Sequence, residues 1–411
     1  MGRVVAQAKM NLDLRMGKNS LWLLIARLGS QAALALFTIL IARQLGSAIF
    51  GEYAFITAIV FIGNMVTTFG TDMILIRDIA ARQDYSRLAP SLIIQLSLSA
   101  VFIAVTFLTS SLAALKIYSL SLIPLAFFTV FTSVLRGQQR MGLYAILGLT
   151  TAAMQLFFGL LFIQRGTSII TVATLLLMIQ IVAAFIAWAL CRRQIPHWTT
   201  SRDLFISALK ASAPIAVLGI IAILYQKISI LMVTFSLDAT STGWFSAALR
   251  VIEFAKIGHL AVFTALYPAM AKDQNKGFAK EWVALLFAAS ALSAFLFLFA
   301  SPIIFILFGT DYIAAVSLLR LLAWVLIPFT LNTLLVLFFL AAGNERPVLY
   351  ASSISLLILV ALNMWWIPLT GIAGAGWSLL AAESAQTVVL IFYRNRASIT
   401  NRVAHEFPQS T

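Results

Sequence analysis

Cysteine and histidine are scarce in this 411-residue chain, which has one cysteine, Cys191, and three widely separated histidines. One thiol excludes an internal disulfide, a Cys-x-x-Cys redox pair and a multi-cysteine metal site, and the histidines lack metal-ligand spacing. No GxxxxGK[ST], HExxH or GxSxG motif is present, and no polar segment is long enough for a nucleotide-binding domain. These absences argue against an enzyme and an ATP-driven pump, and we expect no metal and no cofactor.

Charge is also scarce, since 10% of the residues are charged and 62% are hydrophobic. A soluble domain has about 25% charged and roughly 45–50% apolar residues, so this composition indicates an integral membrane protein. The net charge of +14 does not indicate a nucleic-acid partner, because that would require basic residues clustered on a soluble domain. Here they occupy short segments between apolar runs.

The apolar runs have the length of membrane spans. A helix needs about 20 apolar residues to cross the hydrocarbon core of a bilayer. By this rule the sequence predicts an all-α, multi-pass membrane protein with about twelve transmembrane helices. Their approximate ranges are 20–42, 52–70, 90–111, 118–136, 141–163, 168–190, 213–236, 243–269, 283–308, 314–341, 348–367 and 372–393.

The basic residues outside these runs predict the orientation. If the N-terminus is cytoplasmic, only Arg43, Lys116 and Arg165 fall in outer segments, and the others fall in inner ones. Lys and Arg concentrate in the cytoplasmic loops of membrane proteins. We therefore expect a plasma-membrane protein with both termini in the cytoplasm.

One polar phrase occurs twice, as "GQQRMGLYA" (137–145) and "GNERPVLYA" (343–351). Both copies follow an even-numbered predicted span, so both face the cytoplasm and indicate two like-oriented halves rather than an inverted repeat. A weaker pair, "LGSAIFGEY" (45–53) and "LDATSTGWF" (237–245), falls on the outer side of each half. The sequence thus predicts two six-helix lobes, 1–205 and 206–411. We interpret the repeated phrase as structural, with glycine ending a helix and arginine and tyrosine at the interface.

Several charged residues fall inside the predicted spans. A charge at the bilayer centre costs about 2.5–3.5 kcal/mol on insertion scales, so such residues normally face a bundle interior or a wet cavity. The cations are Arg27, Lys227, Arg250, Lys256 and Arg320, and the carboxylates are Glu253 and Glu383. A net-positive interior suits an anionic substrate, and phosphate is the obvious partner for Arg and Lys.

Some of these residues allow two interpretations. Glu253 either neutralises Arg250 or Lys256, at three residues' distance, or supports substrate binding. Arg320 either extends its side chain to the outer interface or lines the interior. Glu383 either pairs with a lysine or titrates as a coupling group, and His259 is either a hydrogen-bonded interior residue or a proton relay. Gln31 lies one turn from Arg27.

Three stretches carry a family resemblance. They are "ARQLGSAIFGEYAF" (42–55), "TFGTDMILIRDIAAR" (68–82) and "LFGTDYIAAVSLLRLLAW" (307–324). They resemble motifs of the Wzx-type polysaccharide and O-antigen flippases, within the multidrug/oligosaccharidyl-lipid/polysaccharide exporter superfamily. The resemblance covers nearly the whole chain and identifies the superfamily better than the substrate.

The resemblance implies two six-helix bundles around a central cavity that opens alternately to each side. It implies a flippase that moves undecaprenyl-pyrophosphate-linked oligosaccharide, an O-antigen or capsular repeat unit, to the outer leaflet of a bacterial inner membrane. A polymerase or chain-length complex is an expected partner. Arg27, Lys227, Arg250 and Lys256 would bind the pyrophosphate or glycan, and Gln31, Glu253, His259, Arg320 and Glu383 would support binding or coupling.

Three alternatives stay open. The first is a drug/cation antiporter of the multidrug and toxin extrusion (MATE) type, in which acidic residues would dominate. The second is a flippase for lipid II, although such proteins typically have fourteen spans. The third is a scaffold in polymer synthesis that transports nothing.

Overall fold

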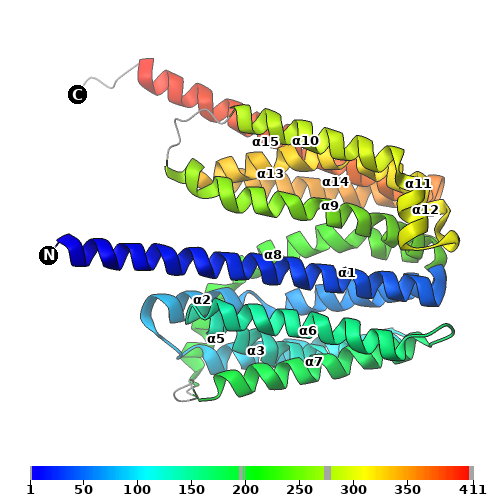
Figure 1. Cartoon of the computed structure of the whole chain (residues 1–411), viewed down its shortest axis with the longest axis horizontal. Coiled ribbons are helices and arrows are strands. Elements are labelled where there is room, and N and C mark those ends of the chain that lie inside the picture. Colours follow the sequence, from blue (N-terminus) through cyan, green and yellow to red (C-terminus); the bar gives the residue numbers. More distant parts are fainter. Residues whose placement is uncertain (1, 194–197, 199, 273–278, 407–411) are drawn as a thin grey trace. The chain divides into compact units, whose positions relative to one another are not determined.

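The chain is all-helical wherever the computed structural model describes it. Backbone is described for residues 2–193, 198, 200–272 and 279–406, and side chains for residues 28–193, 198, 200–258, 280 and 282–396. These residues contain no strand (Figure 1). The helices are α1 (Gly2–Thr68), α2 (Thr71–Arg82), α3 (Leu88–Thr109), α4 (Ala113–Ser119), α5 (Leu122–Gly137), α6 (Met141–Phe162), α7 (Ile169–Cys191), α8 (Arg202–Ser236), α9 (Ala239–Lys272), α10 (Ala279–Leu298), α11 (Ala300–Leu307), η1 (Thr310–Tyr312), α12 (Ala314–Ala323), α13 (Leu326–Ala341), α14 (Arg346–Thr370) and α15 (Ile372–Glu406).

Most of these helices have the length and apolarity of membrane spans. Among the described residues nine helices qualify, or ten if α10 and α11, bent by 70°, form one broken span. α1 counts once, although it contains the two predicted spans 20–42 and 52–70. Its backbone breaks between them at Gly46, whose φ of 77° is a conformation that favours glycine. α9 covers the predicted span 243–269 but carries charged residues near its middle. The predicted class, an all-α multi-pass membrane protein, is confirmed.

The structure contains a helix that the sequence did not predict. Residues 71–82 were expected to be part of a connecting segment, but they form α2. Its buried residues, Thr71, Ile74, Leu75 and Ile79, recur at helical spacing along one face. α2 is therefore an amphipathic helix, too short to cross a membrane, that packs by its apolar face.

The chain separates into two compact units. Unit 1 comprises Met1–Gly46 and Ile56–Ile223, and unit 2 comprises Ser47–Phe55 and Leu224–Thr411. α1 and α8 therefore each contribute residues to both units. The predicted domain boundary after residue 205 stays a prediction.

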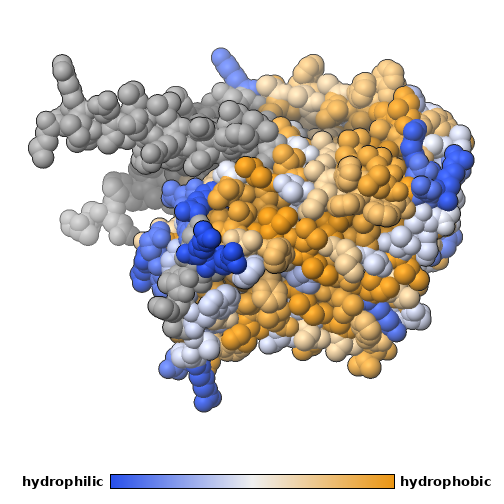
Figure 2. All heavy atoms as spheres, turned by 60° about the horizontal axis from the view of Figure 1, so that its bottom comes forward, coloured by the Kyte–Doolittle hydropathy of each residue, from blue (hydrophilic) through white to orange (hydrophobic). Residues whose placement is uncertain are grey.

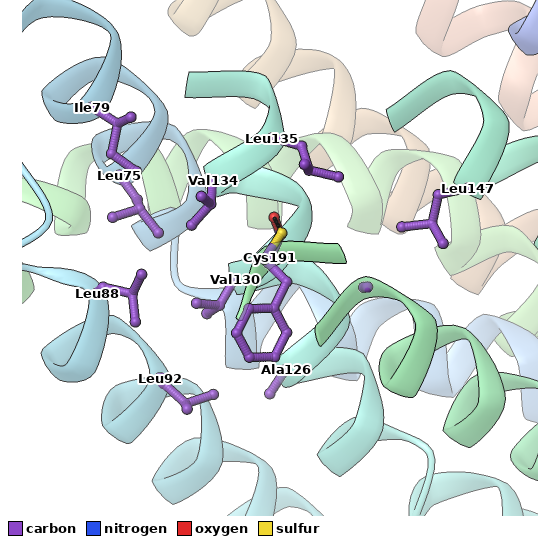
Figure 3. Close-up of a cluster of buried hydrophobic side chains, with 12 residues drawn as sticks. Leu75, Ile79, Leu88, Leu92, Ala126, Val130, Val134, Leu135, Leu147 and Cys191 are labelled. Carbon is purple, nitrogen blue, oxygen red and sulfur yellow. Dashed lines mark hydrogen bonds between the residues drawn. The ribbon is translucent and has the colours of Figure 1, made fainter. Parts of the chain in front are cut away.

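Unit 1 has an apolar core where α2, α3, α5, α6 and α7 meet. Figure 3 shows Leu75 and Ile79 of α2 facing Val130 and Val134 of α5, with the buried Cys191 of α7 beside them. The Cys191 thiol donates a hydrogen bond to the carbonyl oxygen of Phe131, at 3.4 Å. Cys191 thus acts as a small buried apolar residue with a satisfied polar atom.

Unit 1 also exposes many large apolar side chains. Figure 2 shows apolar residues over the middle of the visible face and hydrophilic residues toward its ends. Leu108, Phe157, Phe162 and Phe185, on α3, α6 and α7, are all exposed. A soluble protein rarely leaves such side chains exposed in numbers, whereas a lipid-facing surface requires them.

In unit 2, a short part of α1 packs against residues from the second half of the chain. The ring of Phe50 lies 6.3 Å from that of Phe308 and 6.0 Å from that of Tyr312, and all three side chains are buried. Aromatic pairs at such distances stabilise beyond their buried area. Phe50 belongs to the stretch 42–55, and Phe308 and Tyr312 to the stretch 307–324, so two of the family-like motifs pack on each other.

Two glycines allow the backbones of α1 and α9 to approach closely within unit 2. A Cβ atom added at Gly51 would overlap the carbonyl oxygen of Ala239, and one added at Gly243 would overlap that of Ser47. Ser47 and Gly51 are four residues apart, as are Ala239 and Gly243, which is the small-xxx-small spacing of close helix crossings. These residues hold equivalent places in the weaker sequence repeat, so its two copies pack directly against each other.

The stronger repeat forms two similar helix-ending turns. Within unit 1, the N–H of Arg140 donates to the carbonyl oxygen of Leu135, and within unit 2 the N–H of Asn344 donates to that of Phe339. The left-handed residue is Gln139 in the first turn, with φ 58°, and Gly343 in the second, with φ 68°. The prediction that glycine ends the helix is therefore right for Gly343. Gly137 instead lets α5 approach α2, because a Cβ there would lie 2.7 Å from the Cβ of Ile79.

Candidate substrate site

Unit 2 contains a cluster of three charged side chains, which we call the outer-shell triad: Lys227, Arg250 and Glu253. α9 places Arg250 and Glu253 three residues apart, so both lie on neighbouring parts of its surface. Nη1 of Arg250 lies 2.8 Å from Oε2 of Glu253. Nζ of Lys227, on α8, lies 3.4 Å from Oε1 of the same carboxylate. One carboxylate therefore bridges two cations from two helices.

A second cluster, which we call the inner pair, is formed by Lys256 and Glu383. Nζ of Lys256 on α9 lies 3.7 Å from Oε1 of Glu383 on α15, and 3.9 Å from the centre of the Phe329 ring. The amide of Asn332 donates to the other oxygen of Glu383, at 2.7 Å, and Thr387 donates to the amide oxygen of Asn332, also at 2.7 Å. α9 and α15 both pack against α13, which carries Phe329 and Asn332 (Figure 1).

The two clusters differ in accessibility. The side chains of Arg250 and Glu253 are 30% and 34% exposed, whereas that of Glu383 is 3% exposed. Lys227 is buried, with 10% of its side chain exposed, and Lys256 is intermediate, at 22%. The outer-shell triad can therefore be reached by a ligand, whereas the carboxylate of the inner pair is shielded and fully engaged.

The charges of the two clusters nearly cancel. With every group ionised, three cations face two carboxylates, and each cation has a carboxylate within 4 Å. Pairing is what makes such residues tolerable in a low-dielectric interior, because an unpaired buried charge is strongly destabilising. A ligand must therefore compete with a resident carboxylate for these cations.

Neutral polar residues complete the interior of unit 2. Asn363, fully buried on α14, donates to the hydroxyl of Ser229 on α8 at 3.0 Å. Ser355 donates to the carbonyl oxygen of Ala382, at 2.8 Å. The buried hydroxyl of Tyr225 lies near Glu383 and Ser355 without reaching hydrogen-bonding geometry to either. Sequence reasoning missed Asn332 and Asn363, although each stands out as an amide inside an apolar run.

Of the other predicted site residues with described side chains, neither Arg320 nor Gln31 takes part in these ion pairs. Arg320 is exposed at the end of α12, where its guanidinium lies 5.9 Å from the centre of the Phe297 ring. Gln31 is exposed on α1. The side chains of Arg27 and His259 lie outside the described residues. Among the side chains that are described, no three His, Cys, Asp or Glu gather as metal ligands would.

The fold defines an all-helical, polytopic membrane protein with paired charges inside its helices, and solved membrane proteins share this fold. The chain is similar to a structure of the lipid II flippase MurJ in an inward closed conformation, with 16% identity over 90% of this chain and 87% of that one and a TM-score of 0.76. It is also similar to a MATE structure in complex with MaD3S, with 16% identity over 94% and 96% of the two chains and a TM-score of 0.64.

A third similar structure is a MOP superfamily transporter from Pyrococcus furiosus, whose description reports a binding pocket of reversed polarity. It shares 15% identity over 93% of this chain and 95% of that one, with a TM-score of 0.64. A comparison with curated proteins finds no match. The model of the family described as polysaccharide biosynthesis protein matches residues 16–274. The chain belongs to this family, and the family resemblance predicted from the motifs is confirmed.

Proposed function

We propose that the protein is a flippase that moves a polyprenyl-pyrophosphate-linked oligosaccharide across the membrane by alternating access. The substrate is an undecaprenyl-pyrophosphate-linked O-antigen or capsular repeat unit, carried to the outer leaflet of a bacterial inner membrane, with both termini of the protein in the cytoplasm. A polysaccharide polymerase or chain-length complex would receive the unit. Membership of the polysaccharide biosynthesis family supports this proposal.

The observation that carries the proposal is the grouping of Lys227, Arg250 and Lys256 inside one helical unit. Moving a pyrophosphate through hydrocarbon is costly, because a low dielectric penalises unpaired charge. Cations within the protein replace part of the lost hydration, and guanidinium and ammonium groups both bind phosphate oxygens. Arg27 is also proposed to bind the pyrophosphate or glycan, while the polyprenyl tail stays in the lipid.

The test is complementation of a strain that lacks its own O-antigen flippase. Wild-type protein should restore surface glycan, and the double variant Lys227→Ala/Arg250→Ala should reduce it about tenfold or more, since truncating a buried charge contact costs several kcal/mol. The matched control is Arg165→Ala, which removes an exposed cation outside the spans. Equal amounts of membrane protein should be confirmed by immunoblot. Wild-type glycan levels with the double variant would contradict the site.

A drug/cation antiporter of the MATE type is the second candidate, and one observation favours it. Glu383 is almost fully buried and is held by an amide and an ammonium group, as a cation-coupling carboxylate would be. This alternative expects drug resistance on overexpression, lost in Glu383→Gln, and no effect on surface glycan. A lipid II flippase would instead rescue cells depleted of their own lipid II flippase. A scaffold would show no leaflet exchange in proteoliposomes.

A further inference from the structure

Glu253 is the part of the outer-shell triad that the proposed function does not explain. For the binding of an anion, a carboxylate between the two cations is unfavourable, because it competes with the anion for both of them. Yet Oε1 of Glu253 faces Lys227 at 3.4 Å and Oε2 faces Arg250 at 2.8 Å, so each oxygen engages a different cation. The carboxylate therefore occupies the position where an anionic ligand would contact both.

The chemistry of this position matches that of a phosphate oxygen pair. A carboxylate and a phosphoryl group both present two oxygens to a guanidinium or an ammonium group, and Arg and Lys bind either. Glu253 therefore stands in for one phosphoryl group of a diphosphate. A ligand that displaced the Glu253 carboxylate would contact the same two cations, Lys227 and Arg250.

Accessibility indicates that Glu253 can be displaced, whereas Glu383 cannot. The Glu253 side chain is 34% exposed and has no contact besides its two cations among those the described residues show. Glu383 is 3% exposed, and Asn332 holds its second oxygen at 2.7 Å. A ligand anion that took the place of Glu253 would keep Lys227 and Arg250 paired, so the exchange avoids the cost of leaving a buried cation unpaired.

We propose that Glu253 is a resident counter-anion that competes with the diphosphate of the substrate. In the empty protein it neutralises Lys227 and Arg250. An arriving diphosphate displaces it, and its return to the two cations promotes release of the diphosphate. This inference rests on the proposed function. Glu253 thus lowers the affinity for the diphosphate and promotes its release, and it does not itself bind the substrate.

The experiment compares binding to purified wild-type protein and to Glu253→Gln, which keeps the shape and removes the charge. The probes are undecaprenyl pyrophosphate and undecaprenol, measured by native mass spectrometry in the same detergent. Glu253→Gln should bind undecaprenyl pyrophosphate about tenfold more tightly than wild type, a shift worth about 1.4 kcal/mol. Undecaprenol binding should not change. Glu345→Gln, an exposed carboxylate in the turn before α14, is the matched control and should bind as wild type does.

The outcomes separate the inference from the proposed function. If wild type prefers undecaprenyl pyrophosphate to undecaprenol, and Glu253→Gln binds it equally or more weakly, the inference is wrong and the proposed function stands. If neither protein prefers the pyrophosphate, both are wrong.

A second measurement on wild-type protein covers the case in which Glu253→Gln does not fold. Carbodiimide labelling of carboxylates, followed by mass spectrometry, should modify Glu253 more rapidly after undecaprenyl pyrophosphate is added, because the carboxylate leaves its cations. Glu383 should keep its slow rate. A lower rate at Glu253 would overturn the inference.

Discussion

The two units solve the problem of polar groups in a membrane differently. In unit 1 the core of α2, α3 and α5 is apolar, and its buried polar contact is neutral, from the amide of Gln95 to the hydroxyl of Thr71 at 2.8 Å. Its ion pairs among the described residues join Asp78 of α2 to Arg87, before α3, and to Arg77, all outside the membrane-spanning helices. Unit 2 instead places ionised groups inside its spanning helices. Among the described side chains, the ion pairs inside the helices therefore belong to unit 2, whereas Arg27, which is also proposed to bind substrate, belongs to unit 1 and its side chain is not described.

The largest expected effect comes from breaking the inner pair. Glu383→Leu leaves Lys256 without a carboxylate and removes one of the two acceptors of the Asn332 amide, whose other acceptor is the backbone carbonyl oxygen of residue 383. We therefore expect a loss of about 3 kcal/mol of stability. The double variant Glu383→Leu/Lys256→Met should recover much of this loss, because the unpaired charge is gone. Thermal unfolding in detergent measures both. A single variant as stable as wild type would show that the pair contributes nothing to the packing of unit 2.

Adding a methyl group where helices pack closely should destabilise the protein by different amounts in the two units. Gly51→Ala in unit 2 sets a methyl group against backbone atoms of Ala239 and Gly243, which cannot move aside, so we expect a loss of about 3 kcal/mol. Gly63→Ala in unit 1 meets the far end of the Phe102 ring, which can shift, and should cost about 1 kcal/mol. Gly142→Ala is the control, since nothing lies within 4 Å of an added Cβ there. Equal losses in the two units would contradict this ranking.

The smallest expected effect concerns the two turns of the repeated phrase. Gln139 adopts a left-handed conformation that Gly343 adopts in the equivalent turn. Gln139→Gly should therefore stabilise by about 0.5 kcal/mol, and Gly343→Gln should destabilise by a similar amount or more. The thermal midpoints of the two variants, measured together, should move in opposite directions. A loss of stability on Gln139→Gly would show that the Gln139 side chain has a packing role.

Sequence alone was sufficient for the all-helical membrane class, because this class follows from the length of the apolar runs. It also placed Arg250 and Glu253 within reach, since residues three apart are neighbours on a helix. The helix α2 was missed because charged residues interrupt its apolar ones, so it contains no long apolar run.

The pairs that cross between helices could not be derived from sequence. Lys227 is paired with Glu253 across α8 and α9, and Lys256 with Glu383 across α9 and α15, so both depend on how the helices pack. The count of in-span charges predicted a strongly positive interior, but pairing leaves an excess of one cation in the two clusters. Because the charges nearly balance, Glu253 already neutralises cations that the substrate would bind, and it therefore competes with the substrate.

The most direct test of the account is leaflet exchange in proteoliposomes. Purified protein is reconstituted with an undecaprenyl-pyrophosphate-linked oligosaccharide, and an added glycosidase cleaves the glycan exposed on the outer leaflet over time. We predict that wild-type protein makes the whole lipid pool accessible, and that Lys227→Ala/Arg250→Ala slows this exchange about tenfold or more. Exchange at the protein-free rate with wild type, or equal exchange by the double variant, would contradict the central claim.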